Sequence, residues 1–487
     1  MFTKHQAMIT GAALCALSIT AFVPDGYAQS KDNEVLIEQL GSNTIDVLQG
    51  ANGLAKNNVA TALQAGSGNV GLLKQGASEK QLSTQSTAWD NTAALTQNGN
   101  GNEADISQGE FGTARGNTAT LTQSGDVNSA SIDQGYIGGL AEDNTGTLIQ
   151  NGEDNWARIS QGRFGPARDN TATLTQNGNT NSGSISQGPQ VNGPTKDNTA
   201  TLTQNGDDNR ALISQGGLSE SDEPGAVVNN AATLTQSGDE NNAEISQGNE
   251  SGIAENNALT LIQNGNSNFA RAFQGFELGT AKDNTAMLTQ NGSNNRASTI
   301  QGVSNSNAEN NLGTTKDNTA MLTQNGSNNR ASTIQGVSNS NAENNTATLA
   351  QNGDDNLAFI SQGELGTAKN NNATSVQNGS DNEADIFQGY IGGYAKDNTA
   401  TLTQDGNNNQ TDIFQGSNFI KVKNQDGIFV TDERDGNDAF RSTAIISQQG
   451  TDHYAAAIQT GTDDMITIEQ RGAGGFVRVA QGTPIPQ

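Results

Sequence analysis

The sequence predicts an all-β fold, a β-solenoid of about 16 stacked strand-turn-strand coils with a cross-β, amyloid-like arrangement. Two observations predict it: a short frame of alternating residues recurs along most of the chain, and Gly recurs at fixed places in that frame. Composition points the other way. Hydrophobic residues make up 32% and aromatic residues 4% of the chain, which is typical of disorder, but a fixed period indicates stacked repeats instead.

The N-terminal segment has the pattern of a secretory signal peptide. Lys4 precedes a mostly apolar stretch, Ala7 to Val23, and Gly26 and Ala28 place small residues at the −3 and −1 positions of a cleavage site. We therefore predict cleavage after Ala28 and a secreted, extracellular, cell-surface protein. A membrane anchor is the alternative, which the short apolar stretch and its polar residues disfavour.

Charge and composition exclude several classes of function. The formal net charge is −27, so we expect neither nucleic-acid binding nor membrane association or insertion. Cleavage would remove Cys15, the single cysteine, and would leave one histidine, His453, so no triad of catalytic side chains can form. A carboxylate pair could hydrolyse glycosides, but the acids lie in repeated turns rather than at one place. We predict no enzyme activity, no catalytic residue, no cofactor and no metal site.

The segment Asn91–Gly109 illustrates the repeated frame. Asn, Ala, Leu and Gln stand at alternate positions up to Gln97, Gly99 follows in a polar turn, and Asn, Ala, Ile and Gln alternate again up to Gln108. Two runs of period 2 around a Gly-containing turn predict a strand, a tight turn and a second strand.

The frame recurs with Gln six residues and Gly eight residues after each start. The starts are Asn33, Asn58, Asn91, Asn117, Asn144, Asn170, Asn198, Asn230, Asn257, Asn284, Asn318, Asn345, Asn371, Asn398, Ser442 and Asp464. Lys316–Asn345 repeats Lys282–Asn311 residue for residue, as an internal duplication would. We divide the chain into the signal peptide 1–28, fourteen repeats in 29–416, an irregular insertion or degenerate repeat in 417–441, two repeats in 442–482 and a tail, 483–487.

The alternation predicts which side chains form the interior. If Ala, Leu and Ile point inward, the flanking Asn and Gln must point inward too, and each amide can bond its own copy in the next coil. Gly would supply the positive φ that a tight turn needs. The predicted structural ladder is represented by Asn91, Gln97, Gly99, Asn102, Gln108, Asn170, Gln176, Gly178, Asn181, Gln187, Asn398, Gln404, Gly406, Asn409 and Gln415.

Charged residues also recur in columns. Lys or Arg precedes the first Asn of most repeats by two positions, as at Arg115 and Lys282, and Glu replaces it at Glu142. We interpret this column as a solvated loop edge, with a ligand-binding stripe as the alternative. Acidic turns such as Asp207-Asp208 could bind calcium, but they lack the glycine-rich pattern of calcium-binding β-rolls; stacked like charges could instead slow assembly.

The frame N-x5-Q-x-G-x-x-N-x-A-x3-Q resembles the curlin repeat of bacterial curli fibre subunits, in which the first position is usually Ser. The resemblance covers about residues 33 to 482. It implies an extracellular functional amyloid that polymerises with itself and supports adhesion and biofilm matrix, export through a curli-type secretion pore, and growth from a nucleator subunit. The chain departs from the family in its larger number of repeats and in lacking an N-terminal targeting stretch before Asn33.

Two non-polymeric functions remain as alternatives. We see no capping helix before Asn33 and few residues after Gln481, so uncapped ends favour a fibre over a soluble adhesin or surface-layer solenoid. Outward threonines such as Thr171, Thr173 and Thr175 recur in several repeats and resemble the arrays of ice-binding proteins. Thr also simply suits exposed strand positions.

Overall fold

The structure is a computed structural model, which describes residues 7–8, 29–50, 53–76, 86–163, 165–188, 195–216, 226–248, 252–276, 279–303, 314–337, 340–423, 429–433 and 438–482. The predicted signal peptide lies outside these residues except for β1 (Ala7–Met8), which pairs in parallel with β3 (Glu34–Gln49). The predicted tail, 483–487, also lies outside them. Signal-peptide cleavage therefore stays a prediction.

One coil consists of three strands rather than the two that the sequence predicts. After Asn91 come β7 (Thr92–Asn100), β8 (Glu103–Gln108) and the short β9 (Thr113–Arg115), which leads to the next frame at Asn117. The alternation of the frame did not predict this third strand. Gly109 has φ 76° and turns the chain, and Ala114 then points into the core with no exposed surface.

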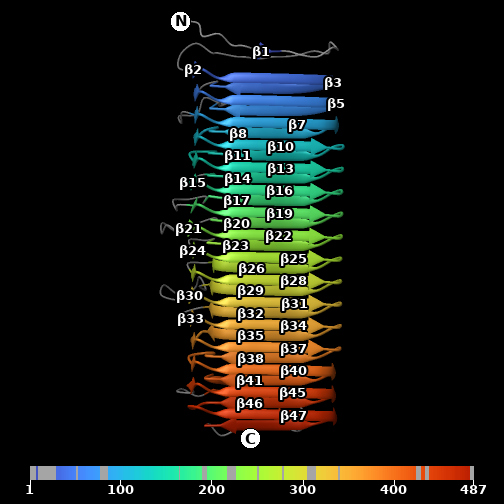
Figure 1. Cartoon of the computed structure of the whole chain (residues 1–487), viewed down its shortest axis with the longest axis vertical. Coiled ribbons are helices and arrows are strands. Elements are labelled where there is room, and N and C mark those ends of the chain that lie inside the picture. Colours follow the sequence, from blue (N-terminus) through green and yellow to red (C-terminus); the bar gives the residue numbers. More distant parts are fainter. Residues whose placement is uncertain are drawn as a thin grey trace. The chain divides into compact units, whose positions relative to one another are not determined.

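The chain forms two compact units, Met1–Glu240 with Asn249–Ser251, and Asn241–Gly248 with Gly252–Gln487. Each is a stack of coils in which strands of the same kind pair in parallel (Figure 1). The solenoid prediction is confirmed, and all secondary structure among the described residues is β.

The strands of the first unit fall into three series. In the first series, β3 and β5 (Val59–Gln75) run through both halves of a coil. The other first strands are β7, β10 (Thr118–Ser124), β13 (Thr145–Asn151), β16 (Thr171–Asn177), β19 (Thr199–Asn205) and β22 (Ala231–Ser237). Second strands are β8, β11 (Ser129–Gln134), β14 (Trp156–Gln161), β17 (Ser182–Gln187) and β20 (Arg210–Gln215). Third strands are β2 (Gln29–Lys31), β4 (Gly53–Lys56), β6 (Ser86–Trp89), β9, β12 (Leu140–Glu142), β15 (Pro166–Arg168), β18 (Thr195–Lys196) and β21 (Val227–Val228).

The second unit has the same three series. Its first strands are β25 (Ala258–Asn264), β28 (Thr285–Asn291), β31 (Thr319–Asn325), β34 (Thr346–Asn352), β37 (Asn372–Asn378), β40 (Thr399–Asn407), β45 (Thr443–Thr451) and β47 (Met465–Ala473). Its second strands are β23 (Asn242–Gln247), β26 (Phe269–Phe276), β29 (Arg296–Val303), β32 (Arg330–Val337), β35 (Leu357–Glu364), β38 (Glu383–Gln388), β41 (Gln410–Gln415), β46 (Tyr454–Gln459) and β48 (Phe476–Gln481). Its third strands are β24 (Ile253–Glu255), β27 (Thr280–Lys282), β30 (Thr314–Lys316), β33 (Asn341–Glu343), β36 (Thr367–Lys369), β39 (Tyr394–Lys396) and β44 (Ala439–Phe440).

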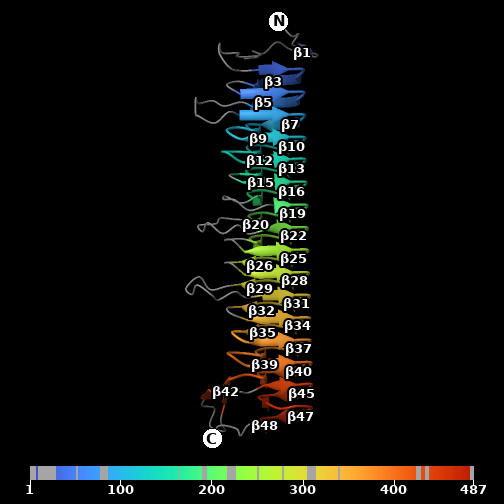
Figure 2. The same cartoon turned by 90° about the vertical axis from the view of Figure 1, so that its left-hand side faces the viewer.

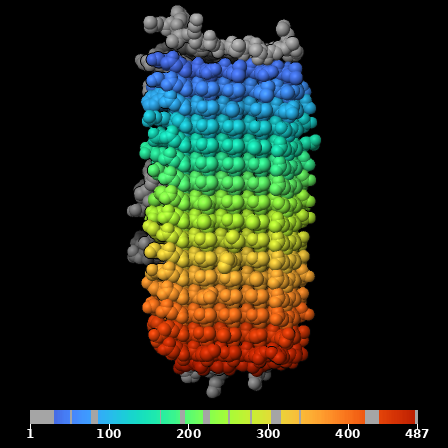
Figure 3. All heavy atoms as spheres, in the orientation of Figure 1, coloured from blue at the N-terminus to red at the C-terminus, as the bar shows by residue number. Residues whose placement is uncertain are grey.

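Register follows the frame, so like residues stack on like. Gln97 pairs with Gln123 and Leu95 with Leu121, and the duplicated segments place each residue of β28 beside its identical copy in β31. Figure 3 shows the result within each unit as level rows of side chains. An exception is the turn in β3. It is one residue shorter than the turn in β5, so the register between the two strands shifts between Ser42 and Thr44.

A narrow core runs inside each stack. Ala93, Leu95, Ala104 and Ile106 are all at most 2% exposed, and their counterparts in neighbouring coils are buried in the same way. Burial of apolar surface contributes roughly 25 cal/mol per Å², and one coil of alanines and a few Leu or Ile buries little. The stability of a coil therefore depends on the coils beside it, as in other solenoids.

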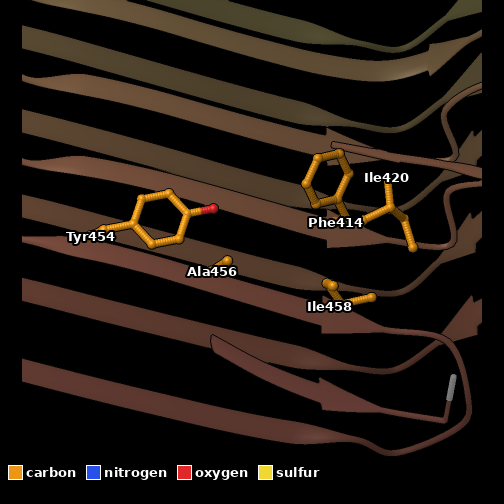
Figure 4. Close-up of a cluster of buried hydrophobic side chains, with 5 residues drawn as sticks. All are labelled: Phe414, Ile420, Tyr454, Ala456 and Ile458. Atoms are coloured by element: carbon orange, nitrogen blue, oxygen red, sulfur yellow. The ribbon is translucent and has the colours of Figure 1, made fainter. Parts of the chain in front are cut away.

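The irregular segment after Gln415 contains an antiparallel hairpin, β42 (Phe419–Lys423) and β43 (Phe429–Glu433). Residues 424–428 and 434–437 of this segment lie outside the described residues. In Figure 2, β42 is drawn beside the stacked strands of the second unit. Ile420 lies beside Phe414 in a cluster of buried side chains that also contains Tyr454 and Ile458, all at most 7% exposed (Figure 4). Ile420 of the hairpin thus contributes to an apolar cluster with residues of β41 and β46.

Candidate assembly site

Buried glutamines form ladders that run along each stack. Gln97 Nε2 donates to Gln123 Oε1 at 2.9 Å, and Gln123 Nε2 donates to Gln150 Oε1 at 2.9 Å. The second strands carry a matching ladder, in which Gln108 Nε2 donates to Gln134 Oε1 at 2.8 Å. These amides donate toward the coil that follows them in the chain.

The same glutamine amides also bond the backbone across the coil. Gln97 Nε2 lies 3.0 Å from the carbonyl oxygen of Asn102, and Gln108 Nε2 lies 3.1 Å from that of Thr92. A buried amide without partners would cost about 1–3 kcal/mol. Here the contacts within the coil and along the stack satisfy it together, which explains how polar residues occupy a core.

Asparagine ladders have the opposite polarity. The backbone N–H and the Nδ2 of Asn117 both donate to Asn91 Oδ1 at 3.0 Å, and Asn117 Nδ2 also bonds the carbonyl oxygen of Ala141 at 2.9 Å. Asn128 donates to Asn102 Oδ1 in the same way. These Asn residues therefore donate to the Asn Oδ1 of the preceding coil, and their Nδ2 groups also bond a carbonyl farther along the chain, as Asn128 Nδ2 does with Gly152.

The other ladder residues predicted from the sequence make equivalent contacts. Asn170 and Asn181 donate to Asn144 and Asn155, while Gln176 and Gln187 donate to Gln204 and Gln215 at 2.8 Å. In the second unit, the corresponding contacts are those of Asn398 with Asn371, Asn409 with Asn382, Gln404 with Gln448 and Gln415 with Gln459. All eight predicted residues are at most 1% exposed.

The turn glycines are required for two separate reasons. Gly99, Gly178 and Gly406 have φ between 114° and 129°, where a side chain strains the backbone. In addition, a Cβ on Gly99 would lie 2.0 Å from the carbonyl oxygen of Gly125 in the next coil. The corresponding distance is 2.2 Å for Gly178 and 1.9 Å for Gly406. The tight stacking of coils, and not only the turn, therefore excludes a side chain.

Sequence reasoning missed a second type of left-handed residue. The non-glycine residue before most ladder Asn residues has φ near 55°, for example Asp90 (57°) before Asn91 and Asp154 (55°) before Asn155. Asp and Asn tolerate this conformation better than other non-glycine residues. The frequent Asp-Asn and Asn-Asn pairs at these places in the sequence were the signal that could have revealed it.

The acidic turns also have a structural role. The side-chain oxygen of the residue after the turn Gly accepts the N–H of the equivalent residue in the preceding coil. Thus Asp126 Oδ1 accepts from Asn100, Asp207 Oδ1 from Asn179 and Asp239 Oδ1 from Asp207, at 2.7 to 2.9 Å. The described residues contain no group of three or more His, Cys, Asp or Glu side chains placed to hold a metal ion.

The charge column lies on the third strands and forms ion pairs between coils. Glu142 lies between Arg115 and Arg168, with N–O distances of 3.5 and 3.1 Å. Lys369 pairs with Glu343 at 2.9 Å, and their hydrogen bond raises the pKa of Lys369 and lowers that of Glu343. The interpretation of this column as a loop edge was wrong, because the residues belong to paired strands.

The last two frames replace their ladder asparagines. Ser442 and Asp464 stand at the first position, and His453 and Gly475 at the second. His453 is 2% exposed, and its Nδ1 accepts the N–H of Gly475 at 3.1 Å. The imidazole thus does what Asn Oδ1 does in the other coils.

A family model described as Curlin associated repeat matches residues 90–125, 195–219 and 441–472. Each segment contains at least one of the frames whose amides form the ladders. A search of curated proteins found no match to the chain. Within the described residues, no helix is long and apolar enough to span a membrane.

Proposed function

We propose that this chain, three segments of which match the curlin-associated repeat, is a secreted subunit that polymerises into curli-like amyloid fibres. The fibres would serve adhesion and biofilm matrix outside the cell. The observation that carries the proposal is the in-register ladder, in which each buried amide bonds its own counterpart in the next coil. Another copy of the chain can supply the same partner wherever a coil is left without a neighbour.

The coil of β47 and β48 offers such a surface. All residues of β46 are buried, whereas all residues of β48 are half-buried. A Cβ on Gly450 would meet the carbonyl oxygen of Gly472 at 1.8 Å, but one on Gly472 would meet no described atom within 4 Å. Parallel strands with an open edge are templates for further pairing. A curli-type secretion pore and a nucleator subunit would be the partners in export and in initiation.

The first test is assembly of the purified chain after dilution from denaturant. We expect unbranched, thioflavin-positive fibrils in the electron microscope and a fibre-diffraction spacing of about 4.8 Å along the fibril. A β-rich monomer that stays dye-negative at high concentration would rule out the proposal.

A matched pair of variants tests the edge itself. Gln470 accepts from Gln448 in the ladder, and the neighbouring Thr467 points outward on the same strand. Gln470→Lys places a charge in the ladder of this coil and should slow seeded elongation about tenfold, because burying an unpaired ammonium is costly. Thr467→Lys adds the same charge on the outer side and should leave the rate nearly unchanged. If both substitutions changed the rate of seeded elongation equally, this edge would not take part in fibre growth.

Ice binding is the second candidate, supported by the register of the first strands. Thr118, Thr145, Thr171 and Thr199 stack in one column of the first unit. A neighbouring column is interrupted by Ile149, and Met287 and Met321 interrupt the equivalent surface of the second unit. Thermal hysteresis of the purified protein would favour this function over fibre formation if it occurred without fibrils.

A further inference from the structure

The third strands at the start of the first unit carry an unusual column of side chains. Lys31, Lys56, Trp89 and Arg115 pair in register from β2 through β4 and β6 to β9. All four are exposed, and Trp89 keeps 41% of its surface accessible. Neighbouring strands are about 4.8 Å apart, so the column forms a continuous stripe along the stack.

The column differs here from its course in later coils. Farther along, carboxylates interrupt the column, as Glu142 does between Arg115 and Arg168, although Lys282 stacks directly on Lys316 and Lys369 on Lys396. Near the start, Trp89 rather than a carboxylate stands between Lys56 and Arg115. Among the described residues, Lys56 has no ion pair.

The nearby carboxylates compensate part of this positive charge, since Glu142 pairs with Arg115 at 3.5 Å. Asp32 lies 3.9 Å from Lys31, and both side chains are more than half exposed, so the pair is weak. Asp90 accepts a hydrogen bond from Asn57 Nδ2 at 2.9 Å, which engages one of its oxygens. Positive charge therefore persists locally on a chain with a net charge of −27.

A groove of about 490 Å³ lies over this column. It is lined by Lys31, Leu54, Ala55, Lys56, Trp89, Asp90 and Arg115. Its lining combines the indole of Trp89, the aliphatic Leu54 and cations on either side of the indole. We call these seven residues the basic–aromatic groove.

We propose that the basic–aromatic groove binds an acidic polysaccharide. An indole face packs against the C–H face of a sugar ring, and Lys and Arg on either side can bond carboxylates of neighbouring sugars through charge-assisted hydrogen bonds. A linear chain suits a stripe that continues from coil to coil. Single-stranded nucleic acid could also stack on Trp89, but its denser charge is disfavoured beside a protein of net charge −27.

The site does not depend on polymerisation. Its side chains lie on the exposed side of the third strands, whereas the proposed contacts between copies are made by the edge of a coil. Failure of fibre assembly and failure of polysaccharide binding can therefore be observed separately. A fibre that binds polysaccharide would repeat the groove once in every copy.

The test uses the full chain with three immobilised probes: an alginate oligosaccharide, neutral dextran and single-stranded oligo(dT). We expect binding to alginate that weakens as salt rises, and weak or no binding to the other two. Trp89→Ala and Lys56→Gln should each weaken alginate binding about tenfold, because each removes one of the principal contacts. Lys369→Gln is the matched control, since it removes the same charge from an ion-paired position of the column in the second unit. It should change binding by less than about twofold.

Other outcomes would overturn the proposal. Absence of alginate binding, equal binding of dextran, or tighter binding of oligo(dT) would each exclude an acidic polysaccharide as the ligand. If Lys369→Gln weakened alginate binding as much as the groove substitutions do, binding would depend only on the net charge of the protein. Both groove substitutions are at exposed positions, and hydrogen exchange of the buried Ala88 and Ala114 amides checks that the coils stay folded.

Discussion

The backbone N–H of Gly475 donates a hydrogen bond to Nδ1 of His453 at 3.1 Å, while the other ring nitrogen of His453 lies 3.4 Å from the carbonyl oxygen of Gln449. The imidazole is buried and stands where other coils have a ladder Asn. Nδ1 can accept this bond only when it carries no proton. A histidine thus replaces an amide within the same hydrogen-bond pattern.

His453→Asn should preserve or improve the attachment of the last coil. The Asn Oδ1 would accept the Gly475 N–H, so we expect hydrogen exchange of that amide to slow or stay unchanged. His453→Leu keeps the volume but removes the acceptor and should cost about 1–3 kcal/mol, because it leaves a donor unpaired. If exchange of the Gly475 amide is the same in both variants, the hydrogen bond does not hold the coil.

Gly178→Ala should destabilise its coil by at least ~2 kcal/mol, since it adds backbone strain and a clash with the carbonyl oxygen of Gly206. Gly472→Ala is the matched control: its φ is 101°, but a Cβ there meets no described atom within 4 Å. The difference between the two free energies of unfolding, measured by urea titration of soluble protein, isolates the cost of the clash. Equal values would show that backbone strain alone requires the glycine.

Gln176→Glu should destabilise the first unit by roughly 3 kcal/mol or more at neutral pH, because a buried carboxylate cannot donate to Gln204 Oε1. At acid pH the protonated carboxyl can donate again, so part of the stability should return. Thr175→Glu introduces the same group on the outer side of the same strand and should have a much smaller effect. Urea titration at two pH values measures both variants, and a loss that is the same at both pH values would contradict the ladder role.

Glu364→Gln should raise the free energy of unfolding at neutral pH. Burial raises the pKa of Glu364, although the Ser361 hydroxyl, which donates to Oε2 at 3.1 Å, lowers it. Between the unfolded and folded pKa values the native state binds more protons, so stability falls as pH rises through that window and stays lower above it. The variant should lack this component of the pH dependence. If wild type and variant respond identically to pH, the carboxyl is not destabilising.

Much of the coil was predictable because it depends on local rules that repeat. Alternation placed Asn91, Gln97 and Leu95 inward, and the amide chemistry of Asn and Gln required partners along the stack. The third strand was not predictable in this way. β15 begins with Pro166 and β21 is two valines, so these short pieces share no period and are defined by pairing between coils.

Other features depend on contacts that no repeat specifies. Ile420 of the hairpin of β42 and β43 lies in a cluster with Phe414 and Ile458, which come from separate coils. The basic–aromatic groove depends on Trp89 lying between Lys56 and Arg115, which are far from it in the sequence. Such neighbours become apparent only once the register of the third strands is known.

The in-register pairing of β28 with β31 has a consequence for the evolution of length. These strands belong to the duplicated segments, so a copied coil lies directly on its template with every residue beside an identical one. A coil makes its contacts with the coils on either side, and for this reason an inserted copy needs no compensating substitution elsewhere. Recombination between repeats can therefore lengthen or shorten such a gene in whole-coil steps while each product remains foldable.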